Sequence, residues 1–148
     1  MADVSMVVYH HTGAMDARPT AEQIAEYQTG PTAHAPFPAI AYHAVIDPDG
    51  TVFTCHDMET LVWGQGAGSA EAIQGVGSNN WRSIAVCFSG QEPTPEQVEA
   101  MGTVADALDT LLHRLVRTIH RHVSRAADGR ELTSCPGETW PRWLDEVR

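Results

Sequence analysis

The chain has 148 residues, a length typical of one compact domain, and its apolar content is ordinary for a globular protein. No apolar run is long enough to cross a bilayer, so membrane association is not expected. The formal charge of -10 repels nucleic acid, which argues against binding to a phosphate backbone. We expect a monomer that binds neither nucleic acid nor membrane.

The first half of the chain predicts a strand, a helix and a hairpin. A β-branched apolar run predicts a buried strand at residues 6–10. A capping box at Thr20 predicts a helix that ends near Gly30. Two extended segments, 42–46 and 51–55, flank an Asp-Pro-Asp-Gly turn and predict a hairpin.

The second half predicts a buried strand at 83–88 and two helices. A second capping box at Thr94 opens a long helix with Pro95 at its first position. Apolar residues with helical spacing follow: Val98, Met101, Ala105, Leu108, Leu112 and Leu115. A short segment at 118–124 leads to a final helix that buries Trp140, Trp143, Leu144 and Val147. Strands that alternate with helices predict a single α/β domain, with a central mixed β-sheet flanked by helices.

Histidines and a cysteine supply candidate metal ligands. His10 and His11 end the first predicted strand, His120 and His122 follow the long helix, and Cys135 precedes Pro-Gly. Imidazole and thiolate are ligands that zinc favours, and three protein ligands leave a fourth position for water. Side chains alternate across a strand, so only one of His10 and His11 can face a given site. These residues alone leave two interpretations open, a zinc site or structural histidines with a buried cysteine that closes a turn.

Six segments in order resemble the type 2 N-acetylmuramoyl-L-alanine amidases, which include phage lysozyme-type amidases and peptidoglycan recognition proteins. The segments are 7–12, 42–52, 80–86, 93–97, 120–124 and 133–137. The resemblance implies that residues 1–148 form a zinc amidase catalytic domain with the α/β fold of that family. It implies hydrolysis of the amide bond between N-acetylmuramic acid and L-alanine in bacterial peptidoglycan, with one zinc ion per chain.

The resemblance also implies roles for individual residues. Zinc would be held by His10, His120 and Cys135. Tyr42 and Thr133 would be catalytic, donating hydrogen bonds to the oxyanion that forms when water activated by zinc attacks the carbonyl. His122 remains a rival to His120, because both would face the same side of an extended segment.

The expected substrate contacts depart from the family pattern. Many relatives carry a histidine in a Gly-x-His-Ala segment, but a glycine stands at that position here. Substrate contact is therefore expected from Trp63 or Gln65, with His11 and Asn80 as further candidates. His11 is expected to point away from the metal. Cys87 stands where one branch of the family has a glutamate, and we expect it to be a packed core residue.

Two other functions stay open at this point. A non-catalytic recognition protein would bind muropeptides without cutting them, although such proteins usually lack the cysteine ligand and Cys135 is present. A zinc-stabilised interaction domain would need a fourth protein ligand. The N-terminus shows no basic segment that leads into an apolar run, so a secretory signal is not expected. We expect an endolysin-like phage protein that stays cytoplasmic until it reaches the wall, or a domain of a longer chain.

Overall fold

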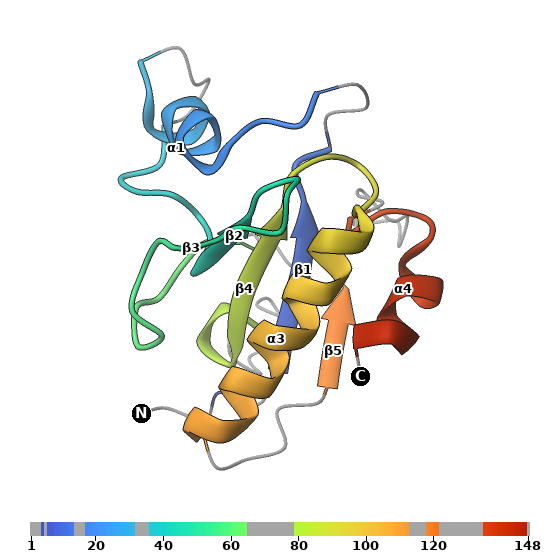
Figure 1. The fold of residues 1–148 in the computed structure, drawn as a ribbon. Helices are drawn as coiled ribbons and strands as arrows, with labels where there is room; N and C mark the ends of the chain where they lie inside the picture. Colours follow the sequence, from blue (N-terminus) through green and yellow to red (C-terminus); the bar gives the residue numbers. More distant parts are fainter. Residues whose placement is uncertain are drawn as a thin grey trace, which may run out of the picture.

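The computed structural model describes residue 4 and residues 6–13, 17–31, 36–64, 79–112, 118–121 (backbone only) and 135–147. Within these residues the chain forms a five-stranded sheet in the order β3-β2-β4-β1-β5 (Figure 1). The strands are β1 (Met6–His11), β2 (Ala44–Ile46), β3 (Val52–Thr54), β4 (Ser83–Phe88) and β5 (Thr118–Arg121). β3 is antiparallel to β2, and the other neighbouring strands are parallel. The mixed sheet confirms the predicted α/β class.

The hairpin of β2 and β3 closes through the predicted turn. Asp47 N donates to Thr51 O at 2.9 Å, and Gly50 has a φ of 84°, a left-handed conformation that glycine adopts without steric cost. A Cβ on Gly50 would lie 2.9 Å from Glu96 O, so the turn packs on the start of helix α3 (Pro95–Leu112). The glycine therefore allows both the reversal and the close approach to α3.

Helix α1 (Ala21–Thr29) begins and ends where the sequence predicts. Thr20 Oγ1 accepts from Gln23 N at 3.3 Å, and Gln23 Oε1 accepts from Thr20 N at 2.9 Å, which completes the capping box. Ala21 N also donates to Asp47 Oδ1 at 2.9 Å. The start of α1 is therefore bonded to the hairpin turn.

Helix α3 starts with the second predicted capping box, in which Thr94 and Gln97 exchange bonds of 2.9 and 3.1 Å. The Gln97 side chain is fully buried, and its Nε2 donates to Ile46 O at 2.9 Å and to Ser89 O at 3.0 Å. Gln97 thus joins the ends of β2 and β4 to α3. No helix in the described residues is long and apolar enough to span a membrane.

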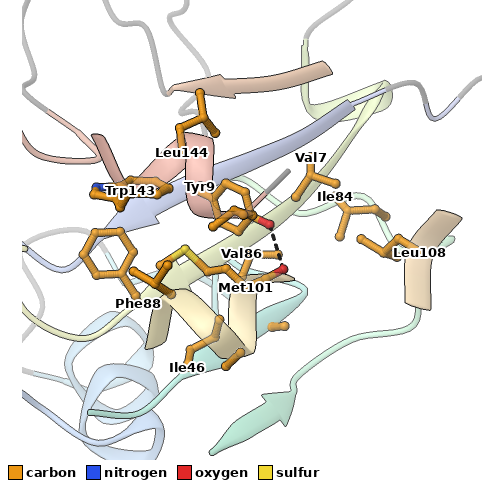
Figure 2. Packing of buried hydrophobic residues seen from close by; sticks show 14 of the residues in the cluster. Val7, Tyr9, Ile46, Ile84, Val86, Phe88, Met101, Leu108, Trp143 and Leu144 are labelled. Carbon is orange, nitrogen blue, oxygen red and sulfur yellow. Dashed lines mark hydrogen bonds between the residues drawn. The ribbon is translucent and has the colours of Figure 1, made fainter. Parts of the chain in front are cut away.

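One side of the sheet, which we call the core face, is covered by α3 and α4 (Trp140–Val147) and holds the larger hydrophobic cluster. Its buried side chains include Val7, Tyr9, Ile46, Val86, Phe88, Met101, Leu108, Trp143 and Leu144 (Figure 2). The Tyr9 ring meets the Trp143 ring edge-on at 5.8 Å, and the Tyr9 hydroxyl donates to Met101 O at 3.2 Å. The apolar residues predicted for the two helices within the described range pack here.

The opposite side of the sheet, the site face, carries the alternate strand residues. Its smaller cluster contains Val45 of β2 and Cys87 of β4, against Ala21 and Ile24 of α1. Cys87 is completely buried, which confirms that it is a packed residue. His10, near the end of β1, belongs to this face because Tyr9 before it belongs to the core face.

Candidate active site

His10 lies between two parallel strands near their carboxyl ends. β1 pairs with β4 on one side, where His10 is opposite Cys87, and with β5 on the other. The His10 side chain is 1% exposed. The alternation of side chains along β1 therefore places a buried imidazole at the carboxyl end of the parallel strands, where ligands of open α/β sheets usually bind.

Cys135 reaches His10 from the other end of the chain. It lies in the turn that leads into α4, and its Sγ is 3.7 Å from His10 Nδ1. The backbone N–H of His11 donates to the same Sγ at 3.3 Å. Burial raises the pKa of the Cys135 thiol to about 12, while the hydrogen bond from His11 acts to lower it. Without a cation beside it, Cys135 is therefore a neutral thiol at neutral pH.

The distance between these two atoms suits a shared zinc ion. A tetrahedral site with Zn–N of about 2.05 Å and Zn–S of about 2.3 Å separates the two ligand atoms by roughly 3.5 Å. The observed separation is 3.7 Å. A bound cation would also favour the thiolate and offset the effect of burial. The donor types and the spacing therefore fit the metal that the sequence predicts.

The third ligand is not tested by the structure. Across the residues with described side chains, no group of three His, Cys, Asp or Glu side chains could hold a metal ion. The register of β5 places the backbone of His120 opposite Val8, two residues before His10. Thr133, Gln65 and the rival ligand His122 lie outside the described residues. The choice between His120 and His122 stays a prediction.

Tyr42 stands beside the His10–Cys135 pair, just before β2. The rings of Tyr42 and His10 have centroids 5.3 Å apart. Burial raises the pKa of Tyr42 well above its usual 10.0, and the neighbouring thiols of Cys87 and Cys135 raise it further. The phenol therefore stays protonated at neutral pH and can donate a hydrogen bond. The structure thus brings together three of the predicted site residues.

His43 holds the backbone next to Tyr42. His43 N donates to Ala85 O at 2.9 Å, and Ala85 N donates back to His43 Nδ1 at 3.0 Å. Because Nδ1 accepts, the ring proton is on Nε2, which donates to Thr60 O at 2.9 Å. Burial lowers the pKa of His43, consistent with a neutral ring. The sequence places a histidine at this position, but nothing in it predicts that the ring bonds to Ala85 N and Thr60 O.

The chain at Gly64 passes directly over the His10 imidazole. A Cβ on Gly64 would lie 2.9 Å from the Ala85 Cβ and 3.3 Å from His10 Nε2. Trp63, a predicted substrate contact, precedes this glycine and is 43% exposed. Glycine is therefore required sterically at this point, next to the His10 imidazole.

A cavity of about 500 Å³ opens beside Tyr42. The described residues that line it carry hydroxyl, amide and apolar groups: Thr12, Gly13, Pro19, Gln23, Ile24, Tyr27, Gln28 and Tyr42. Gln28 is fixed in it, because its Oε1 accepts from Ala41 N at 2.8 Å. The capping box at Thr20 predicts helix α1, but no sequence signal was used to place its Gln23, Tyr27 and Gln28 in a cavity with Tyr42. Their spacing on one side of the helix was the available signal.

Two predicted substrate contacts lie elsewhere. Asn80, in the short 3-10 helix Asn79–Trp81 before β4, is buried and lines a smaller cavity of about 90 Å³ with Val4 and Trp81. The His11 ring packs edge-on against Phe88 at 6.3 Å, away from His10 as expected. Both His11 ring nitrogens are buried, and no side-chain or backbone group among the described residues is within hydrogen-bonding geometry of them. The structure does not bring Asn80 or His11 to the cavity beside Tyr42.

Comparison with known proteins finds one family model, described as N-acetylmuramoyl-L-alanine amidase, that matches residues 1–138. No curated protein sequence matches the chain. Among solved structures, the N-acetylmuramoyl-L-alanine amidase LysC from Clostridium intestinale URNW is 25% identical with a TM-score of 0.66. The match covers 99% of this chain and 83% of LysC.

Two further solved structures share the fold at lower identity. The endolysin of Thermus scotoductus bacteriophage Ph2119 is 19% identical with a TM-score of 0.65, over 97% of this chain and 83% of that one. A variant of Drosophila PGRP-LB in complex with tracheal cytotoxin is 16% identical with a TM-score of 0.65, over 99% and 81%. These matches extend the likeness in fold across nearly the whole chain.

Proposed function

The chain belongs to the N-acetylmuramoyl-L-alanine amidase family, and we propose that it is a zinc-dependent peptidoglycan amidase. The proposed reaction is hydrolysis of the amide bond between N-acetylmuramic acid and L-alanine. The observation that carries the proposal is the His10–Cys135 pair, an imidazole and a thiol 3.7 Å apart beside the ring of Tyr42. Packing of a hydrophobic core would not by itself require two metal-binding groups and a phenol together at the carboxyl end of the sheet.

The proposed zinc ligands are His10, Cys135 and His120, with His122 as the alternative third ligand. When bound, zinc supplies a Lewis acid for the amide carbonyl and lowers the pKa of water toward roughly 7. The His11 N–H supports the thiolate of Cys135 by donating to Sγ. Gly64 excludes a side chain from the space next to His10 Nε2.

The Tyr42 hydroxyl is proposed to donate a hydrogen bond to the oxyanion that forms at the scissile carbonyl. Its raised pKa keeps the hydroxyl hydrogen in place at neutral pH. The geometry of β2 and the bonds of His43 hold the backbone next to Tyr42, so the donor is oriented before substrate binds. Thr133 is proposed as a second donor.

The cavity beside Tyr42 is proposed to receive the substrate next to the scissile bond. Its amide and hydroxyl side chains can bond to peptide and N-acetyl groups. Trp63 and Gln65 are further proposed substrate contacts. Asn80 and His11 have less support, because the structure places them against other parts of the fold.

We place the chain in the context of bacteriolytic endolysins, acting as a monomer on the wall after release from the cytoplasm. The likeness to the LysC amidase and to the Ph2119 endolysin supports this context. Residues 1–148 are proposed to act as the catalytic domain.

A mass spectrum of digested wall tests the proposal. Purified peptidoglycan incubated with the protein should yield stem peptides with a free L-alanine amino group and glycan with a free lactyl carboxylate. A chelator should abolish both products, and added zinc should restore them. Binding to the wall without new amino groups would instead establish a non-catalytic recognition protein. Cleavage that a strong chelator does not affect would contradict the role of zinc.

A further inference from the structure

The turn that carries Cys135 is packed against the connection between β4 and α3. Gly137, at the end of the turn, has a φ of 105°. A Cβ on Gly137 would lie 2.8 Å from Gln91 O and 2.9 Å from Glu92 Oε1. The turn therefore lies directly on the backbone of residue 91 and the carboxylate of Glu92.

Glu92 contacts this segment with both carboxylate oxygens. Oε1 lies against Gly137, and Oε2 accepts a hydrogen bond from the Thr139 hydroxyl. The segment from Gly137 to Thr139, which joins Cys135 to α4, is therefore held by one half-buried side chain. A hydrogen bond to an ionised acceptor is stronger than one between neutral groups.

Glu92 is itself attached to the sheet. Arg18 Nη1 donates to Glu92 O at 3.2 Å and to Ser89 O at 3.2 Å. The same Nη1 is 3.4 Å from Gln97 Oε1, the side chain that joins β2 and β4 to α3. The backbone of Glu92 is therefore held by Arg18, which also bonds to residue Ser89 at the end of β4.

We propose that Glu92 is a positioning residue for the metal site, which holds the Cys135 turn so that Sγ meets His10 Nδ1 at a metal-binding distance. The inference rests on the proposed zinc site. Glu92 neither binds the metal nor touches the substrate in this role. Glu92 contacts the residues that follow Cys135, while the His11 N–H donates to Sγ itself.

Zinc affinity of the folded protein tests the inference without any assay of activity. Thr139→Val removes the hydroxyl donor with little change in shape, and Thr139 O still accepts from Arg142 N. Competition with a chromophoric chelator should show zinc binding weakened about tenfold to a hundredfold, the usual effect of losing a group that orients a ligand. Thr139→Ser, which restores a hydroxyl, should return affinity to near that of the wild type. Thr110→Val is the matched control, because the Thr110 hydroxyl donates to Asp106 O within α3.

Glu92→Ala provides a second variant, which should weaken zinc binding at least as much as Thr139→Val. Thermal unfolding of the metal-free proteins separates positioning from general stability. A lower melting temperature with unchanged zinc affinity in both variants would overturn the inference and leave Glu92 a purely structural residue. Absence of zinc binding in the wild type would instead overturn the proposed function itself, and the two failures are thereby distinguished.

Discussion

The core face and the site face of the sheet are built from alternate residues of the same strands but are packed differently. On the core face, α3 and α4 cover aliphatic and aromatic side chains, and Tyr9 has a backbone acceptor for its hydroxyl. On the site face, α1 packs only Ala21 and Ile24 into the cluster and leaves a cavity of about 500 Å³ beside Tyr42. One face therefore supplies stability, while the other can hold polar groups that selection for stability alone would not favour.

Adjacent residues of β1 show how sharply the two roles divide. Tyr9 packs against Trp143, whereas His10 approaches Cys135. A single step along the strand reverses the face, so the division follows from the pleat. Substitutions on the core face should lower stability, and substitutions on the site face should lower zinc binding or turnover.

The largest effect is expected from Cys135→Ser. Loss of the thiolate should remove most bound zinc and reduce turnover by roughly a thousandfold or more, since a Lewis acid supplies several kcal/mol of transition-state stabilisation. Metal analysis of purified protein and release of amino groups from wall fragments measure the two effects. Full zinc content in the variant would remove Cys135 from the site.

Metal analysis of His120→Ala and His122→Ala distinguishes the two candidate third ligands. The true ligand should match the zinc loss of Cys135→Ser, and the other substitution should retain most of the metal. Equal retention in both variants would contradict a third histidine ligand from this segment.

Met101→Ala should have the largest effect on the core face. Met101 is completely buried, and its truncation should lower the free energy of unfolding by about 3 kcal/mol. Leu111→Ala on the same helix is the control, because Leu111 is 60% exposed and should change stability little. Denaturant unfolding measures both. If Met101→Ala altered zinc affinity in the folded state, the separation of the two faces would fail.

Tyr42→Phe should lower turnover on the order of a hundredfold, about 3 kcal/mol, with zinc content nearly unchanged, because it removes one oxyanion donor. Thr133→Val should cost less, and the double variant should be non-additive if the two donors share the oxyanion. Tyr9→Phe is the control, because it removes a tyrosine hydroxyl that donates to Met101 O on the core face, away from the site. Near-normal turnover of Tyr42→Phe would leave Tyr42 a packing residue.

The smallest expected effect is a pH dependence of stability through His43. Burial lowers the pKa of His43 in the folded protein, so the unfolded chain binds the proton first as pH falls. The stabilisation is present above the usual histidine pKa of about 6.5 and is lost as pH falls through the lowered value. Melting temperatures at pH 7.5 and 5 should differ more for the wild type than for His43→Gln. An equal difference in both proteins would exclude His43, since His11 contributes equally to each.

Much of the fold could be predicted because its signals are local. The residues that specify a local element lie within or next to it in the sequence. This holds for both capping boxes, the Asp47–Gly50 turn and the buried strand 83–88. The alternation along β1 also predicts that His10 and His11 face opposite sides of the sheet, and the His11 ring packs against Phe88 of the core face. Metal ligands and Tyr42, in contrast, were assigned through the family resemblance, because no local spacing relates them.

The helices, the strands and the kinds of group that can bind zinc follow from the sequence, because capping, periodicity and ligand chemistry are properties of neighbouring residues. Folding in three dimensions is what brings Cys135 Sγ to 3.7 Å from His10 Nδ1, 125 positions away, and Glu92 to the Thr139 hydroxyl. It also decided that Gln28 of α1 and Tyr42 line one cavity, and that the proton of His43 is on Nε2. These features depend on how separate elements pack, and packing distances between distant residues leave no periodic signal in the chain.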